Sequence, residues 1–235
     1  MVVGDPSYWA SRFISIDDRL LNRIVAVWPQ CLSVLPPGPE EDVITTNLVQ
    51  LLSKDAEARK LFHWLEYQFE PFGFTTEGLA FSKGQIDMAV LLDQERERYL
   101  AYECKRLNVH YDGSRQSLAT PYVNDGLKRF VTEQYAEGLP VGCMLGYVLD
   151  GDTGFAIGRV HAAIDSNKTT IGLSGSPVTI ASIANVQRFS TQHVRPATSH
   201  EIHVRHALIP FPLIATATVA KADKSKSAAP RSKPR

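Results

Sequence analysis

Two apolar segments near the middle of the chain carry acidic and basic side chains at a spacing that could do chemistry. Asp87 lies in residues 85–92 (QIDMAVLL), and Glu103 and Lys105 lie in residues 99–105 (YLAYECK). Both segments have the composition of β-strands, and the polar run DQERER between them is typical of a turn. Side chains alternate between the two faces of a strand, so Glu103 and Lys105 share one face. Hairpin pairing would then bring Asp87 close to Glu103.

Asp87, Glu103 and Lys105 together offer the groups that phosphodiester hydrolysis requires. Two carboxylates predict a site for a hard divalent cation such as Mg²⁺, with Mn²⁺ as a substitute, because such ions prefer oxygen ligands. A bound metal ion polarises a phosphoryl oxygen and lowers the pKa of a water molecule. Lys105 could orient or deprotonate that water, or stabilise the charge that develops on the phosphate.

The segment 84–107 resembles the PD-(D/E)XK nuclease superfamily, which has the restriction-endonuclease-like fold. Asp87 matches the acid that begins one core strand of that family, and Glu103-Cys104-Lys105 matches its acid-x-lysine triplet. Ile86 stands where the family name places proline. The resemblance covers about residues 40–150. It implies an α/β core with a mixed central sheet, a divalent metal ion and DNA as the substrate.

The same resemblance implies a further acid from an early core helix. Glu41 is the match, with Glu40 as the alternative, and the implied metal ligands are then Asp87, Glu103 and Glu41. Acids at this position have a second explanation, because negative side chains in the first turn of a helix complement its dipole.

An acid-x-lysine triplet alone is a weak signal, since about one is expected by chance in a chain of this size. Its place on the second of two consecutive strands strengthens it. The alternative is a surface ion pair between Glu103 and Lys105 on an exposed strand. That alternative leaves Asp87 as an isolated acid within an apolar strand.

Other residues near these segments could bind the substrate. Lys128 and Arg129 lie on the polar face of a helix expected at residues 122–137, where they could contact phosphates or face solvent. The polar stretch 108–121 is long for a structureless connection, and such loops are often functional. It supplies three further candidates for substrate contact: His110, Tyr111 and Arg115.

The order of elements predicts an α/β domain with a central mixed β-sheet flanked by helices. Hydrophobic spacing and breakers predict the elements as follows: helices at 16–28 (ended by Pro29), from 43 onward, at 56–69, 122–137 and 155–165, and strands at 85–92, 99–105, 141–149 and 199–210. The run 141–149 is almost continuously apolar, which is typical of a buried central strand. We expect a single domain over residues 1–220, with its core at about 40–150.

Charge is distributed unevenly along the chain. Lys and Arg total 25, as do Asp and Glu, but residues 221–235 hold six basic residues and one acid. This low-complexity segment is expected to be a disordered basic tail. The tail therefore carries +5 and the rest of the chain −5, so a grip on a polyanion must come from a local patch or from the tail.

The remaining features favour a cytoplasmic protein without membrane segments. The three cysteines form no CxxC pair, the N-terminus lacks the layout of a signal peptide, and the apolar stretch 207–220 is short and broken by prolines. His200, His203 and His206 have no cysteine partner and a spacing that disfavours a zinc site. No nucleotide-binding loop motif occurs.

The leading hypothesis is a Mg²⁺-dependent endonuclease that hydrolyses double-stranded DNA, with Asp87, Glu103, Lys105 and Glu41 as its catalytic residues. Family analogy places it in bacterial defence, restriction or DNA processing, and favours a homodimer. One alternative is an inactive, nuclease-like subunit that binds nucleic acid or assists assembly. The other is an RNA-directed or repair nuclease.

Overall fold

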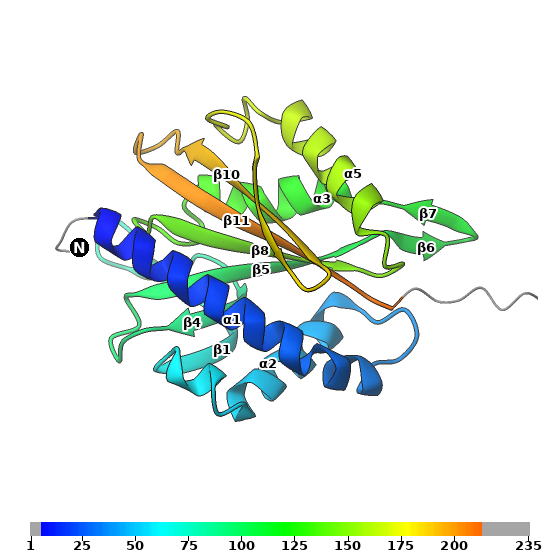
Figure 1. The fold of residues 1–235 in the computed structure, drawn as a ribbon. Helices are drawn as coiled ribbons and strands as arrows, with labels where there is room; N and C mark the ends of the chain where they lie inside the picture. Colours follow the sequence, from blue (N-terminus) through cyan, green and yellow to red (C-terminus); the bar gives the residue numbers. More distant parts are fainter. Residues whose placement is uncertain (1–5, 213–235) are drawn as a thin grey trace, which may run out of the picture.

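The computed structural model describes residues 6–212, and within them the main feature is a seven-stranded sheet (Figure 1). Its strands, in spatial order, are β1 (Trp64–Phe69), β4 (Ile86–Leu91), β5 (Tyr99–Leu107), β8 (Val141–Val148), β11 (Glu201–Pro210), β10 (Val186–Val194) and β9 (Val178–Ile183). β5, β8 and β11 run parallel to one another, and the other neighbouring pairs are antiparallel. The sheet is therefore mixed, and the predicted α/β class is confirmed.

β8 occupies the middle of the sheet, and every one of its residues is buried. This confirms the buried central strand predicted at 141–149. A strand with neighbours on both sides and helices on both faces has no polar surface to present, so its sequence is apolar throughout.

Helices cover both faces of the sheet. Arg205 and His206 are adjacent on β11 and point to opposite faces: Arg205 pairs with Asp17 of α1 (Pro6–Val34), whereas His206 stacks on Phe189 of β10. Phe189 in turn meets His161 of α5 (Thr153–Ser166), whose ring centroid lies 4.6 Å away. Thus α1 lies on one face with α2 (Glu41–Lys54), and α5 lies on the other, which agrees with their placement in Figure 1.

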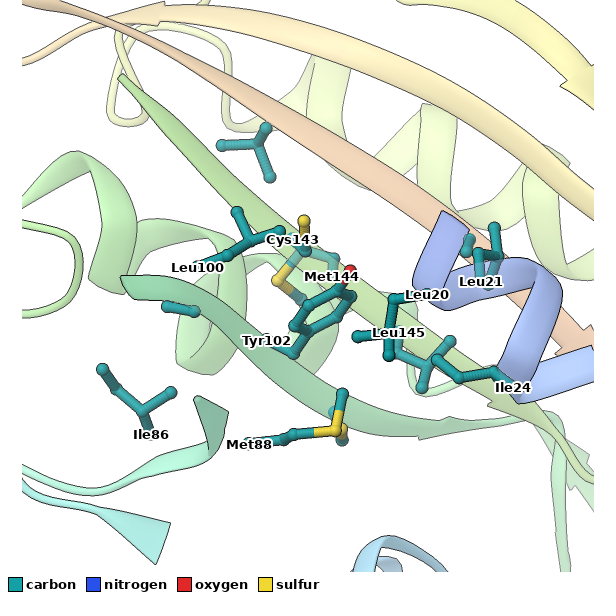
Figure 2. Packing of buried hydrophobic residues seen from close by; sticks show 14 of the residues in the cluster. Leu20, Leu21, Ile24, Ile86, Met88, Leu100, Tyr102, Cys143, Met144 and Leu145 are labelled. Atoms are coloured by element: carbon teal, nitrogen blue, oxygen red, sulfur yellow. The ribbon is translucent and has the colours of Figure 1, made fainter. Parts of the chain in front are cut away.

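The core between α1 and the sheet is close-packed and apolar. Figure 2 shows Leu20 and Ile24 of α1 beside Leu145 of β8, with Tyr102 of β5 next to them. All four side chains are at most 2% exposed. Burial of such side chains stabilises the fold by roughly 1.5–3 kcal/mol each.

The first helix is longer than predicted at both ends, since α1 begins at Pro6 and continues through Pro29 to Val34. A proline inside a helix removes one backbone hydrogen bond, but it does not prevent continuation where packing compensates. Trp28 donates its indole N–H to the carbonyl of Pro210 at 3.0 Å, and Cys31 is fully buried. These contacts hold the last turn against the core.

The helix predicted at 56–69 is wrong. A short 3₁₀ turn, η1 (Ala58–Lys60), is followed by strand β1, which pairs with β4. Leu65 and Phe69 are buried while Trp64 is 62% exposed, and the segment is rich in aromatic residues that favour strands. Pairing with β4 decides the structure of a segment whose apolar spacing also fits a helix.

The stretch 108–121 is not a structureless loop. It contains a hairpin of β6 (Val109–Tyr111) and β7 (Ser114–Gln116). The two turn residues, Asp112 and Gly113, have φ of 48° and 72°, and an Asp-Gly pair with positive φ at both positions is a strong hairpin signal.

The helix predicted at 122–137 is broken into short pieces. After a short helix, α3 (Ala119–Pro121), this range holds a π-helical segment η2 (Tyr122–Leu127) and α4 (Lys128–Val131), and then the chain forms turns. Tyr122 anchors this segment to the sheet through a 2.9 Å hydrogen bond between its hydroxyl and Nδ1 of His206. The predicted helix at 155–165 and strand at 199–210 correspond to α5 and β11.

β9 and β10 were not predicted, and neither was the small sheet of β2 (Phe72–Phe74) and β3 (Ala80–Ser82). β9 is largely exposed and so lacks the apolar alternation that reveals a strand. The predicted tail at 221–235 lies outside the described residues. Between residues 6 and 212, no helix has the length and apolar content that crossing a bilayer requires.

Candidate active site

The candidate site forms where β4 and β5 part. Their pairing ends at Met88 and Tyr102. Beyond this point, the β5 N–H groups that point toward β4 have no partner on that strand. Oδ2 of Asp87 accepts the N–H of Cys104 at 2.7 Å. A carboxylate thus replaces the missing strand carbonyl, which satisfies the backbone and also fixes the position of Asp87.

Glu41 repeats this arrangement two residues further along β5. It is the first residue of α2, and its Oε2 accepts the N–H of Arg106 at 2.9 Å. Its other oxygen, Oε1, lies 2.9 Å from Nζ of Lys105. Glu40 instead pairs with the Arg106 guanidinium, and its side chain is 71% exposed. Of the two acids considered, Glu41 is the one that contacts Lys105.

Lys105 is the point on which three carboxylates converge. Its Nζ lies 2.8 Å from Oε1 of Glu103, 2.9 Å from Oε1 of Glu41 and 3.8 Å from Oδ2 of Asp87. It also donates to the carbonyl of Cys104 at 2.8 Å. The ammonium group is therefore held from several sides.

Asp87 and Glu103 project from the same face of the sheet. Ala89 pairs directly with Ala101, and each lies two residues from one of the acids. The structure thus brings together the four residues singled out from the sequence: Glu41, Asp87, Glu103 and Lys105.

Arg129 and Tyr135 complete the cluster. Arg129 Nη1 donates to Oε1 of Glu103 at 2.9 Å and to the hydroxyl of Tyr135 at 2.7 Å. The Tyr135 hydroxyl donates in turn to the carbonyl of Gln85. The sequence predicts Arg129 as a candidate phosphate contact, whereas it predicts no role for Tyr135, which falls within the helix expected at residues 122–137. Tyr135 follows the end of α4, and its hydroxyl gives no sequence signal of this role.

The π-helical segment brings a glycine over the site. A Cβ on Gly126 would lie 2.6 Å from Cε of Met144, 3.4 Å from Cγ of Glu103 and 3.6 Å from Cγ of Lys105. The methionine end is flexible, but the site side chains are fixed by their ion pairs. Gly126 therefore allows the backbone to approach the site closely, and π-helical turns of this kind often occur at functional sites.

Burial and nearby negative charges raise the pKa values of Asp87 and Glu103. Burial and the nearby charge of Asp87 raise the pKa of Glu103 to about 7, against the opposing effect of Lys105. Burial also raises the pKa of Asp87. Burial would lower the pKa of Lys105, but the charges of Glu103 and its acidic neighbours outweigh it and raise that pKa. Lys105 is thus held protonated, which suits a hydrogen-bond donor better than a proton acceptor.

The donor set fits a hard divalent cation, though not as a ready-made cage. Oε2 of Glu103 is buried and has no hydrogen-bond partner, so one lone-pair-bearing oxygen is open to a ligand. Among residues 6–212 no three His, Cys, Asp or Glu side chains are arranged as a metal-binding group. Mg²⁺ is commonly held by one or two carboxylates plus waters and substrate phosphates, so Asp87 and Glu103 are sufficient in kind.

The candidates for substrate contact lie in different settings. Arg115 pairs with Asp150 at 2.7 Å and with Asp152 at 3.0 Å, and its guanidinium lies 3.7 Å from the ring centroid of Phe155. These contacts attach the β6–β7 hairpin to the start of α5, so Arg115 is not part of the acidic cluster. The other three, Lys128, His110 and Tyr111, form no ion pair within residues 6–212 and are half-buried or exposed.

The cluster lies at the surface rather than in a deep cavity. The side chains of Glu41, Asp87 and Arg129 are 26%, 19% and 33% exposed, whereas that of Glu103 is fully buried. Two hollows, of about 760 and 930 Å³, are lined by other residues. A shallow, charged site suits a polymer better than a small molecule, which usually binds in an enclosed pocket.

Comparison of the chain with known proteins gave no match to a protein-family model, to a curated protein or to a solved structure. The chemistry of the site is therefore inferred from its residues and their geometry.

Proposed function

We propose that this protein is a metal-dependent deoxyribonuclease of the PD-(D/E)XK type. The observation that carries the proposal is the convergence of Glu41, Asp87 and Glu103 on Nζ of Lys105, from a helix start and two paired strands. An ion pair on an exposed strand would need only Glu103 and Lys105, and it would not bury Glu103 completely.

Each residue has a role that follows from its position. Asp87 and Glu103 would hold Mg²⁺ or Mn²⁺, because their carboxylates share a face and Oε2 of Glu103 lacks a partner. When bound, the metal ion would polarise the phosphoryl oxygen and lower the pKa of a nearby water. Lys105, held protonated, would orient the attacking water and stabilise negative charge on the phosphate.

Glu41 would act as a positioning residue. It accepts hydrogen bonds from Nζ of Lys105 and from the backbone N–H of Arg106 at the same time. It therefore fixes the position of the Lys105 ammonium group relative to β5. Side chains fixed in this way lose little freedom when the substrate binds, which favours catalysis.

The substrate we propose is double-stranded DNA, with a homodimer as the form that cuts both strands. A nucleic acid presents a repeating phosphate to a shallow site, and Arg129, one-third exposed beside Glu103, offers it a guanidinium. The basic segment 221–235 would add sequence-independent affinity. A role in bacterial defence, restriction or DNA processing is part of the same proposal.

One observation favours a second candidate, a nuclease-like subunit that binds nucleic acid without cutting it. The ammonium group of Lys105 stands among the carboxylates where a metal ion would otherwise neutralise them. Metal binding separates the two candidates, since the binding subunit needs no metal ion.

The test is cleavage of plasmid and linear DNA in Mg²⁺ by the wild type and by Asp87→Asn. We expect cleavage by the wild type and loss of cleavage in the variant. Asp165→Asn is the matched control, because Asp165 is 77% exposed on α5 and pairs only with Lys168 among the described contacts. Cleavage that survives Asp87→Asn would contradict the proposal.

A further inference from the structure

Arg129 is a second cation on a carboxylate that the proposed function assigns to the metal ion. Oε1 of Glu103 lies 2.8 Å from Nζ of Lys105 and 2.9 Å from Nη1 of Arg129. Lys105 is 15% exposed and has two other acids beside it, whereas Arg129 is 33% exposed and has Glu103 as its carboxylate. Moving Arg129 away from Glu103 therefore costs less free energy than moving Lys105 away from it.

The position of Arg129 is built into the fold from the other side as well. Its Nη1 donates to the Tyr135 hydroxyl at 2.7 Å, and its guanidinium lies 5.4 Å from the centroid of the Tyr135 ring. Tyr135 is tied to the carbonyl of Gln85, two residues before Asp87. The guanidinium is thus linked through Tyr135 to the residue that directly precedes β4, the strand that carries the other proposed metal ligand, Asp87.

A divalent cation and a guanidinium repel each other when both approach one carboxylate. A phosphate diester gives the guanidinium a charged, bidentate partner in exchange. Because Arg129 is partly exposed and Glu103 is fully buried, the arginine can reach a phosphate at the surface while Glu103 remains inside.

We propose that Arg129 is a latch on the metal site, which holds Glu103 in the free protein and moves to a substrate phosphate when nucleic acid binds. This inference rests on the proposed function, since it takes the substrate to be a polyanion and Glu103 to be a metal ligand. In this role, Arg129 couples metal binding to substrate binding.

Such coupling is reciprocal, so DNA should tighten metal binding by the same factor as the metal tightens DNA binding. Coupling energies of this kind correspond to changes of about 5–150-fold in affinity. Without Arg129, Lys105 is the one cation left on Glu103 among these two, so the metal ion meets less competition and the effect of DNA on metal affinity should shrink.

The experiment is calorimetric titration of Ca²⁺ into the full chain, with and without a short DNA duplex, for the wild type and Arg129→Gln. Ca²⁺ keeps the duplex intact. In the wild type, we expect DNA to tighten Ca²⁺ binding about fivefold or more. In Arg129→Gln, Ca²⁺ should bind more tightly than in the wild type without DNA, and DNA should tighten it by a smaller factor than in the wild type.

Lys128→Gln is the charge-matched control, because it removes one positive charge from the neighbouring residue without touching Glu103. It should change the DNA-free Ca²⁺ affinity much less than Arg129→Gln does. Tyr135→Phe is a second variant that keeps both cations and removes only the tether. It should shift the DNA-free affinity in the same direction as Arg129→Gln, by a smaller factor.

Equal or weaker Ca²⁺ binding by Arg129→Gln, or no Ca²⁺ binding by either protein, would overturn the latch. The nuclease proposal is judged separately by DNA cleavage in Mg²⁺. If Asp87→Asn abolishes cleavage while Arg129→Gln leaves Ca²⁺ affinity unchanged, the latch fails and the proposed function stands. If the wild type neither binds a metal ion nor cuts DNA, both fail.

Discussion

Oε1 of Glu41 lies 2.9 Å from Nζ of Lys105, although the two residues are 64 positions apart in the chain. The same carboxylate accepts the N–H of Arg106, so the start of α2 is attached to β5 at the point where β4 has already parted from it. An acid at a helix start therefore has a use here beyond its interaction with the helix dipole.

Replacing Glu41 tests whether this attachment positions Lys105 for catalysis. Glu41→Gln keeps an oxygen that can accept one hydrogen bond but loses the charge that holds Nζ. We expect activity to fall by about 10–100-fold, as is typical for groups that orient site residues. The measurement is the DNA cleavage rate, with Glu40→Gln as its control because Glu40 contacts Arg106 and not Lys105. Equal rates for the two variants would remove Glu41 from the site.

Glu103 should make stability depend on pH in the absence of metal. Its pKa is about 7 in the folded protein, against an ordinary value of 4.5. The folded state therefore holds a proton that the unfolded state has lost between these values, so this group lowers the free energy of unfolding as pH rises through that window. The loss should reach about 3 kcal/mol, since one pKa unit corresponds to about 1.4 kcal/mol.

Glu103→Gln removes this titration. Relative to the wild type, its free energy of unfolding should rise between about pH 4.5 and about pH 7 and then level off. Urea unfolding in the presence of a chelator measures it. Glu57→Gln, at an exposed acid paired with Lys60, should show no such trend. If the difference between Glu103→Gln and the wild type were the same at all pH values, the folded-state pKa would be ordinary.

The identity of the metal ion should separate binding from turnover. Mg²⁺ and Mn²⁺ should support cleavage, whereas Ca²⁺ should support DNA binding with little turnover, because Ca²⁺ prefers longer bonds and more ligands. Cleavage and DNA binding are measured side by side in each ion. Full cleavage activity in excess chelator would rule out a metal-dependent mechanism.

The basic segment 221–235 should contribute affinity that does not depend on DNA sequence. Each phosphate neutralised steepens the dependence of log affinity on log salt by about 0.9 for duplex DNA. Deleting residues 221–235 should weaken binding to all duplexes alike and flatten that slope, while the rate at saturating substrate stays nearly constant. Titrations of duplex DNA at several salt concentrations, with and without residues 221–235, measure this slope. Identical slopes would mean that the segment is not part of binding.

The two strands of the site were predictable because strand parity and a polar turn are local signals. Glu103 and Lys105 could be placed on one face from their spacing, and hairpin pairing was expected to bring Asp87 close to Glu103. The parting of β4 and β5 was not predictable, because it depends on where pairing stops between Met88 and Tyr102. That parting is what allows Asp87 to accept the N–H of Cys104.

Contacts that depend on irregular backbone were not predicted from the sequence. Tyr135 was placed on a continuous helix, but the chain passes through a π-helical segment and then turns, which directs its hydroxyl to Arg129 and Gln85. Similarly, the apolar spacing of Leu65 and Phe69 fits a helix, and only pairing with β4 makes that segment a strand. Tertiary contacts override local preference in both cases.

The most direct test of the central claim is the rate of Mg²⁺-dependent DNA cleavage by Lys105→Ala compared with the wild type. Lys60→Ala is the control, because Lys60 is 63% exposed and pairs with Glu57 outside the site. We predict that Lys105→Ala lowers turnover by about 10²–10³, the range for loss of one positioned group that stabilises charge in the transition state, while Lys60→Ala does not change it. A rate for Lys105→Ala within about twofold of the wild type would contradict the account, because so small a change is far below that range.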